Sequence, residues 1–212
     1  MFPDAFESKN QKEFAERLCG RALTKPIMLI LYNEDPKTKK NIKYLNQITF
    51  RSEKIALACK FFKVIQHSFN GISKASPLEK IIGGKRLPRI VLLSLDGKTF
   101  KKAEGKVSPS KLFSMMKTIV RKDFKRNLGT FVSKMRKMLN MIDKFAIEKQ
   151  NLERKKQALM SKSKITKSAL KTIKKQENLI ETKRKEIGKK LQTLLDWTKL
   201  PEKLAKEPDF SK

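Results

Sequence analysis

Residues 22–32 read ALTKPIMLILY and combine a helix end, a proline and an apolar run. Because proline disfavours the helical conformation in the residue before it, Lys25-Pro26 ends the helix expected over residues 9–23. The run at residues 27–32, IMLILY, is apolar on both faces. Such a strand is typical of the centre of a sheet covered on both sides. The stretch therefore predicts a buried central strand preceded by a helix.

Caps and turns mark the elements that follow this strand. The expected helices are one carrying Ile42, Leu45 and Ile48, short ones begun by Ser52 and by Ser76-Pro77, and one begun by Ser108-Pro109. The expected strands cover residues 61–67, 88–95 and 98–103. Between the last two, Asp96-Gly97 suits a tight turn, because glycine accepts a positive φ. This order predicts an α/β domain with a mixed sheet between helices.

The same order, with three local signatures, resembles the thioredoxin-like superfamily over about residues 9–126. The signatures are ALTKPIMLILY at 22–32, LPRIVLL at 87–93, and LDGK at 95–98 followed by Glu104-Gly105. The resemblance implies a thioredoxin-like fold with a cis proline at Pro88. It also implies that Leu87, Pro88 and Arg89 are candidates for holding an extended peptide. A thioredoxin-like domain with a Lys- and Glu-rich helical tail is similar to bacterial proteins of undefined role.

The redox chemistry of that superfamily needs Cys-x-x-Cys at the start of the helix after the central strand, where the helix N-terminus lowers a thiol's pKa. Counted from Tyr32, the corresponding stretch is Pro36-Lys37-Thr38-Lys39, without a cysteine. We therefore expect no catalytic residue and no enzyme activity. The only cysteines, Cys19 and Cys59, are interpreted as buried structural thiols. An atypical oxidoreductase using one cysteine stays open as an alternative.

Motifs for other cofactors are absent from the sequence. His67 is the only histidine, which excludes metal sites built on several histidines. Gly83-Gly84-Lys85 is too short for a phosphate-binding loop and is interpreted as a helix stop. We expect neither a metal nor another cofactor.

The spacing of apolar residues changes after Gly129-Thr130. Apolar residues then recur in steps of three and four, on Phe131, Met135, Met138, Ile142, Phe145 and Leu152, and again on Leu170, Ile173, Ile180, Ile187, Leu191 and Leu194. Two such seams joined by the polar residues 161–167 predict an antiparallel coiled-coil hairpin, although Lys149, Glu177 and Arg184 interrupt them. The sequence thus divides into a thioredoxin-like domain, residues 1–127, and a basic helical arm, residues 128–212.

The chain carries 51 Lys and Arg against 21 Asp and Glu, a net charge of +30. This favours attraction to polyanions, although 41 of the 51 are lysine, which solvates helices without the planar fork of arginine. No secretory signal or membrane-length apolar run is visible, so a cytoplasmic location is expected. The resulting hypothesis is binding or scaffolding through protein contacts of both parts. Nucleic-acid or anionic-surface binding by the arm, and a homodimer through the arm, stay open.

Overall fold

The computed structural model describes residues 8–9, 13–14, 17, 24–161 and 166–199. Most of the helix expected over residues 9–23, and Cys19 within it, lies outside these ranges. The chain forms two compact units, one reaching Val132 and the other covering Ser133–Trp197.

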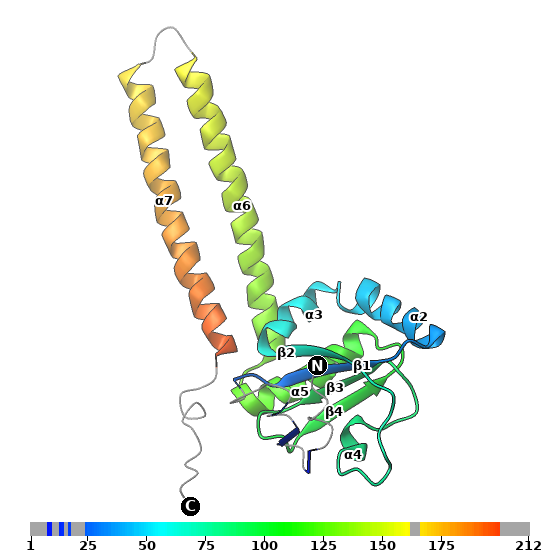
Figure 1. Ribbon diagram of the computed structural model, residues 1–212. Helices are drawn as coiled ribbons and strands as arrows, with labels where there is room; N and C mark the ends of the chain where they lie inside the picture. Colours follow the sequence, from blue (N-terminus) through cyan, green and yellow to red (C-terminus); the bar gives the residue numbers. More distant parts are fainter. Residues whose placement is uncertain (1–7, 10–12, 15–16, 18–23, 162–165, 200–212) are drawn as a thin grey trace, which may run out of the picture. The chain divides into compact units, whose positions relative to one another are not determined.

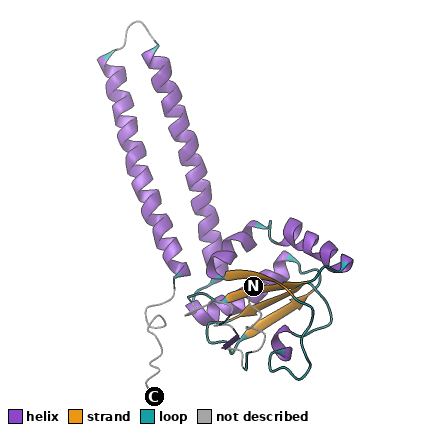
Figure 2. Cartoon of the chain, viewed as in Figure 1, coloured by secondary structure: helices purple, strands orange, loops and turns teal. Residues whose placement is uncertain are grey.

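The first unit contains a mixed four-stranded sheet (Figures 1 and 2). Its strands are β1 (Ile27–Tyr32), β2 (Lys63–Ser68), β3 (Arg89–Leu93) and β4 (Phe100–Glu104). They lie in the order β2-β1-β3-β4, with β1 parallel to β2 and β3 antiparallel to both of its neighbours. The central position predicted for residues 27–32 is confirmed.

Helices flank this sheet. They are α2 (Pro36–Tyr44), α3 (Glu53–Ala58), α4 (Glu79–Ile82) and α5 (Pro109–Phe124), with a 3-10 turn, η3 (Cys59–Phe61), before β2. Ile27, Leu29 and Leu31 of β1 share one core cluster with Leu78, Ile81 and Ile82 around α4. Because side chains alternate along a strand, Met28 and Ile30, which are also buried, face the other side of the sheet. Both faces are therefore covered, as the apolar run predicts.

The helix after β1 departs from the prediction at its end. Leu45–Thr49 forms a π-helical turn, η2, directly after α2. A π turn contains more residues than an α turn, so it rotates the face that the helix presents. Leu45 and Thr49 are buried, whereas Ile48, expected beside Leu45, is 51% exposed.

Two long helices follow, α6 (Leu128–Met160) and α7 (Lys167–Leu195), and a short 3-10 turn, η4 (Asp196–Thr198), comes after them. The first turn of α6 belongs to the first unit, because the Phe131 ring stands edge-on to Phe61 with centroids 4.8 Å apart. The division after Val132 thus falls later than the boundary expected after residue 127. In the described part of the chain, no helix combines the length and the apolar character needed to cross a membrane.

Candidate functional site

The stretch Pro36-Lys37-Thr38-Lys39, which the resemblance of the sequence sets at the Cys-x-x-Cys position, forms the first turn of α2. The Asp35 carboxylate caps this turn, accepting hydrogen bonds from the backbone N–H groups of Lys37 at 2.8 Å and Thr38 at 3.3 Å. A helix N-terminus stabilises negative charge through such N–H groups. Here the chain's own carboxylate already occupies them.

The Leu87–Pro88 peptide bond is cis. Arg89 pairs with Leu31 in the register of β3 with β1, which places Pro88 at the end of β1 that leads to α2. The Pro88 side chain is buried, and its carbonyl accepts a hydrogen bond from the Gly105 N–H at 2.8 Å. The proline thus lies at the same edge of the sheet as the thiol-free turn.

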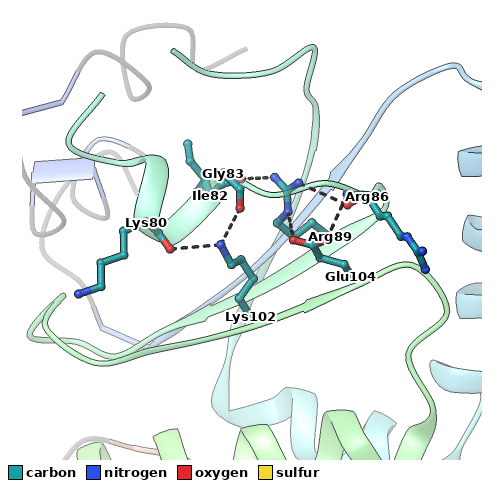
Figure 3. Close-up of polar contacts among 7 residues, drawn as sticks. All are labelled: Lys80, Ile82, Gly83, Arg86, Arg89, Lys102 and Glu104. Carbon is teal, nitrogen blue, oxygen red and sulfur yellow. Dashed lines mark hydrogen bonds and ion pairs between the residues drawn. The ribbon is translucent and has the colours of Figure 1, made fainter. Parts of the chain in front are cut away.

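The Arg89 side chain points toward Glu104 and the segment after α4 (Figure 3). Its side chain is 2% exposed, and its Nε lies 3.3 Å from Glu104 Oε1. The guanidinium also donates to the carbonyls of Ile82 and Arg86. Of the three residues proposed to hold a peptide, Pro88 and Arg89 are buried and Leu87 alone is partly accessible.

Further contacts from β4 hold the segment between α4 and β3. Lys102 Nζ donates to the carbonyls of Gly83 at 2.6 Å and Lys80 at 3.2 Å, and the Arg86 N–H donates to Glu104 Oε2 at 3.1 Å (Figure 3). We call Arg89, Glu104 and Lys102 the loop lock. The sequence reasoning missed it, although an arginine opening the apolar strand RIVLL was an available signal.

An open hollow of about 440 Å³ lies between the end of β1 and the side of α2 and η2. Its lining residues are Tyr32, Asn33, Glu34, Lys39, Ile42, Lys43, Asn46 and Gln47. This lining contains no thiol, no imidazole and only one carboxylate, so it offers polar contacts to a ligand and no nucleophile with a matching base.

Cys59 is partly buried, and this burial raises the pKa of its thiol to about 11. The thiolate is the reactive form of cysteine, so this thiol is a poor nucleophile near neutral pH. Burial also lowers the pKa of His67. The described residues contain no group of three or more His, Cys, Asp or Glu side chains placed to hold a metal ion.

A second polar cluster ties the end of α5 to the turn between β3 and β4. Asp123 is buried and accepts a hydrogen bond from the Leu95 N–H at 3.0 Å, and burial raises the pKa of its carboxyl to about 6. Lys122 Nζ lies 2.7 Å from Asp96 Oδ2. Burial raises the pKa of Asp96, but hydrogen bonds from Lys122, Ser94 and Lys98 outweigh it and lower that pKa to about 2. Both carboxylates therefore hold the turn.

The residues predicted for the seam of the arm fall into three groups. Met135, Met138, Leu152 and Leu194 are buried, and Ile142, Phe145, Ile173, Ile180, Ile187 and Leu191 are half-buried. Two depart from the prediction: Phe131 packs in the first unit, and Leu170 is 46% exposed while its neighbour Ala169 is half-buried.

Three contacts join α6 to the other half of the second unit. Lys156 Nζ lies 2.7 Å from Glu177 Oε1, and Lys183 Nζ lies 2.6 Å from Glu148 Oε2. Lys134 Nζ lies 4.8 Å from the ring centroid of Trp197, the distance of a cation–π contact. Arg184, expected on the seam, is exposed, and Lys183 takes the half-buried position.

Comparison with protein-family models gave no match for the chain, and a search of curated proteins gave none either.

Proposed function

We propose that the protein is a non-enzymatic binding or scaffolding protein, built from a redox-inactive thioredoxin-like domain and an antiparallel coiled-coil arm. One observation carries this proposal: the first turn of α2 holds no thiol, and Asp35 occupies its N–H groups. Cys59 does not replace the missing pair, because its pKa is raised to about 11 by burial.

The thioredoxin-like assignment is supported by local arrangement. The strand β1, buried except at Tyr32, leads through three residues into α2, and a cis proline precedes β3. A tight turn with Gly97 at a φ of +65° joins β3 to β4, and the long helix α5 follows β4. These are the features that the resemblance of the sequence implies, in the same order.

The antiparallel arm is supported by the order of its contacts. Lys134, Glu148 and Lys156 follow one another along α6, whereas their partners Trp197, Lys183 and Glu177 run in reverse order. This is the order that two helices pointing in opposite directions produce. The half-buried residues on both helices recur at seam spacing, which also favours this packing.

A protein partner is favoured by apolar side chains that stay exposed on the arm. Among the described residues, eight large apolar side chains are exposed, and six of them lie on α6 and α7. They are Leu139, Met141, Ile147, Met160, Leu170 and Leu179. Contact with a partner would remove this apolar surface from water, which is favourable.

Two experiments test the proposal. In an insulin-reduction assay with dithiothreitol, the chain should give no turnover above the dithiothreitol background. Turnover that disappears in Cys19→Ser or Cys59→Ser would overturn the redox-inactive assignment. Site-specific photo-cross-linking in the native host, from Leu179 and from the matched exposed position Gln176, tests the contacts. A discrete protein adduct is expected from Leu179 alone, and equal labelling from both positions would contradict a defined partner surface.

A further inference from the structure

A stripe of lysines follows the outer side of α7. Its members are Lys167, Lys171, Lys174, Asn178, Thr182, Lys185 and Lys189, and all of them are exposed. Successive members are three or four residues apart, which keeps them on one face of an α-helix. At 1.5 Å per residue the stripe is about 33 Å long. We call these seven residues the α7 stripe.

The stripe lies opposite the seam. Lys171, Lys185 and Lys189 each stand two residues before a half-buried seam residue, Ile173, Ile187 and Leu191 respectively. Two residues correspond to about 200° of rotation around an α-helix of 3.6 residues per turn. When the apolar side of α7 is covered, the stripe therefore faces outward, available to a ligand.

The charge of the stripe is not compensated within the described residues. Its positions include no acid, and its five lysines form no ion pair there. Of the three acids on α7, Glu177 pairs with Lys156 and Glu181 with Arg184, and Glu186 is exposed and forms no ion pair with a lysine of the stripe in the part of the chain that the structure describes. Five like charges along one line attract a partner that carries regularly spaced negative charge.

We propose that the α7 stripe binds the sugar–phosphate backbone of double-helical nucleic acid, without reading its sequence. A duplex carries about one negative charge per 1.7 Å of axis, so a straight helix about 33 Å long, close to one turn of the duplex, lies in a strongly negative potential along its whole length. Lysine supplies point charges without the planar fork that reads guanine, which suits backbone contact. The Asn178 side-chain amide adds a hydrogen-bond donor of the kind that contacts phosphate oxygens, whereas the Thr182 hydroxyl already donates to the Asn178 carbonyl at 3.0 Å.

The composition of α7 favours this ligand over other polyanions. Proteins that grip single strands stack bases on aromatic side chains, and α7 contains no aromatic residue. A helix that lies on a membrane needs its apolar face toward lipid, whereas the apolar face of α7 is half-buried on the opposite side from the stripe. The stripe itself has no apolar member for packing against a protein helix.

The test compares two variants of the full chain with the same loss of charge. The first carries Lys171→Gln, Lys174→Gln and Lys185→Gln on the stripe. The control carries Lys137→Gln, Lys144→Gln and Lys155→Gln, which are exposed on α6. Glutamine keeps a high helix propensity, so circular dichroism should show equal helicity in both variants.

Binding is measured by fluorescence anisotropy between 50 and 200 mM salt. The probes are a 25-base-pair DNA duplex, the same duplex as RNA, a 25-nucleotide oligothymidine, polyglutamate and anionic lipid vesicles. Each phosphate contact contributes about −0.9 to the slope of log K against log salt. The stripe variant should therefore lose about 2.7 from the slope on duplexes and weaken binding on the order of 100-fold or more near 100 mM salt.

The α6 control should keep the slope of the unmodified chain. If both variants lost the same affinity and the same salt slope, the net charge alone would explain binding, and the α7 stripe would not be a distinct site. Tighter binding of polyglutamate, vesicles or oligothymidine than of either duplex would overturn the ligand. DNA and RNA duplexes bound alike support backbone recognition, and a base-sequence preference would contradict it. None of these outcomes depends on the protein partner, which the cross-linking experiment tests separately.

Discussion

Lys156 on α6 and Glu177 on α7 form an ion pair with 2.7 Å between Nζ and Oε1, at positions of the apolar repeat. The hydrogen bond from Lys156 to Glu177 raises the pKa of the lysine. A second pair lies further along the two helices, where Lys183 Nζ is 2.6 Å from Glu148 Oε2. Arg184, the next residue, pairs with Glu181 on its own helix. The second unit thus carries two oppositely charged pairs between its helices.

The pair between Lys183 and Glu148 predicts that Lys183→Glu destabilises the arm. The substitution replaces an ion pair with two facing carboxylates. Because both side chains are about half exposed, the cost should be about 0.2–1 kcal/mol, and it should shrink in high salt. Thermal unfolding of the arm by circular dichroism measures it. The double variant Lys183→Glu with Glu148→Lys restores the pair in reverse and should recover the loss. A double variant no more stable than Lys183→Glu alone would show that the register is different.

Replacing seam residues with acids tests whether the two helices pair at all. Ile142→Asp and Ile187→Asp place carboxylates at half-buried positions of the repeat. Desolvation should cost about 1–3 kcal/mol at each site. The helical signal of the arm should fall, while the melting of the first unit stays in place. The control pair Ile147→Asp and Leu179→Asp alters exposed apolar positions and should leave helicity unchanged.

The same seam could pair within one chain or between two chains, and sedimentation equilibrium separates these cases. An intramolecular hairpin keeps its mass on dilution, whereas a dimer loses mass. A monomer whose helicity survives both seam substitutions would contradict pairing of the two stripes in either form.

The buried carboxyl of Asp123 predicts a dependence of stability on pH. Its pKa is raised to about 6 in the folded protein, against an ordinary value of 3.8. Between these values the folded state binds more protons than the unfolded state, so its free energy of unfolding falls as pH rises from about 4 to about 6. Asp123→Asn keeps an acceptor for the Leu95 N–H and removes the titration. It should stabilise the protein by about 1–2 kcal/mol at pH 7 and leave stability at pH 4 nearly unchanged.

Urea unfolding of the unmodified chain and the variant at pH 4, 5, 6 and 7 measures this difference. Asp96→Asn is the contrasting variant, because the pKa of Asp96 is lowered to about 2. Its loss of stability should be greatest at neutral pH. A difference between unmodified chain and Asp123→Asn that does not change with pH would contradict the assigned titration.

The loop lock predicts a large effect from one buried ion pair. Glu104→Gln leaves the Arg89 guanidinium in a site where the arginine is 2% exposed. Removing one partner of a buried pair leaves an uncompensated charge, so the cost should be about 2–4 kcal/mol. Glu34→Gln makes the same chemical change in the exposed pair with Lys39 and should cost under about 1 kcal/mol. Denaturant unfolding compares the two, and equal costs would contradict a special role for Arg89.

Gly84 adds a backbone test of the same lock. Its φ is +152°, and a Cβ there would overlap Glu104 Oε1 and approach the Arg89 guanidinium. Gly84→Ala should therefore destabilise the first unit, by about 1–3 kcal/mol from backbone strain alone. Gly71 also has a positive φ but open space around it, so Gly71→Ala serves as the control for strain without collision.

The sheet could be predicted because its signals are local. The apolar run of β1, the caps at Ser108 and the turn at Asp96-Gly97 each specify their element with few neighbouring residues. The π turn at Leu45–Thr49 could not be predicted, because its residues carry the same apolar spacing as an α-helix. The π turn rotates the helix face and exposes Ile48. Contacts with residues far away in the sequence decide this change.

The sequence predicts where the thiol-free turn and Pro88 lie, but it does not predict the contacts of Arg89. Counting from Tyr32 located the thiol-free turn and the proline, since both depend on spacing along the chain. The inward direction of Arg89 depends on Glu104, fifteen residues away, and on carbonyls after α4. On the arm, the three- and four-residue spacing predicted that Leu170 and Arg184 lie on the seam. The structure instead half-buries Ala169 and Lys183, the latter paired with Glu148 on the other helix.

The Asp35 cap would affect any attempt to introduce a Cys-x-x-Cys pair into this domain. Cysteines introduced at Pro36 and Lys39 would meet a helix end whose Lys37 and Thr38 amides already serve a carboxylate. The fixed negative charge would also oppose formation of a thiolate, so such thiols would stay protonated near neutral pH. We therefore expect that two cysteines alone would not give a reactive pair at this turn, and that Asp35 would have to be replaced as well.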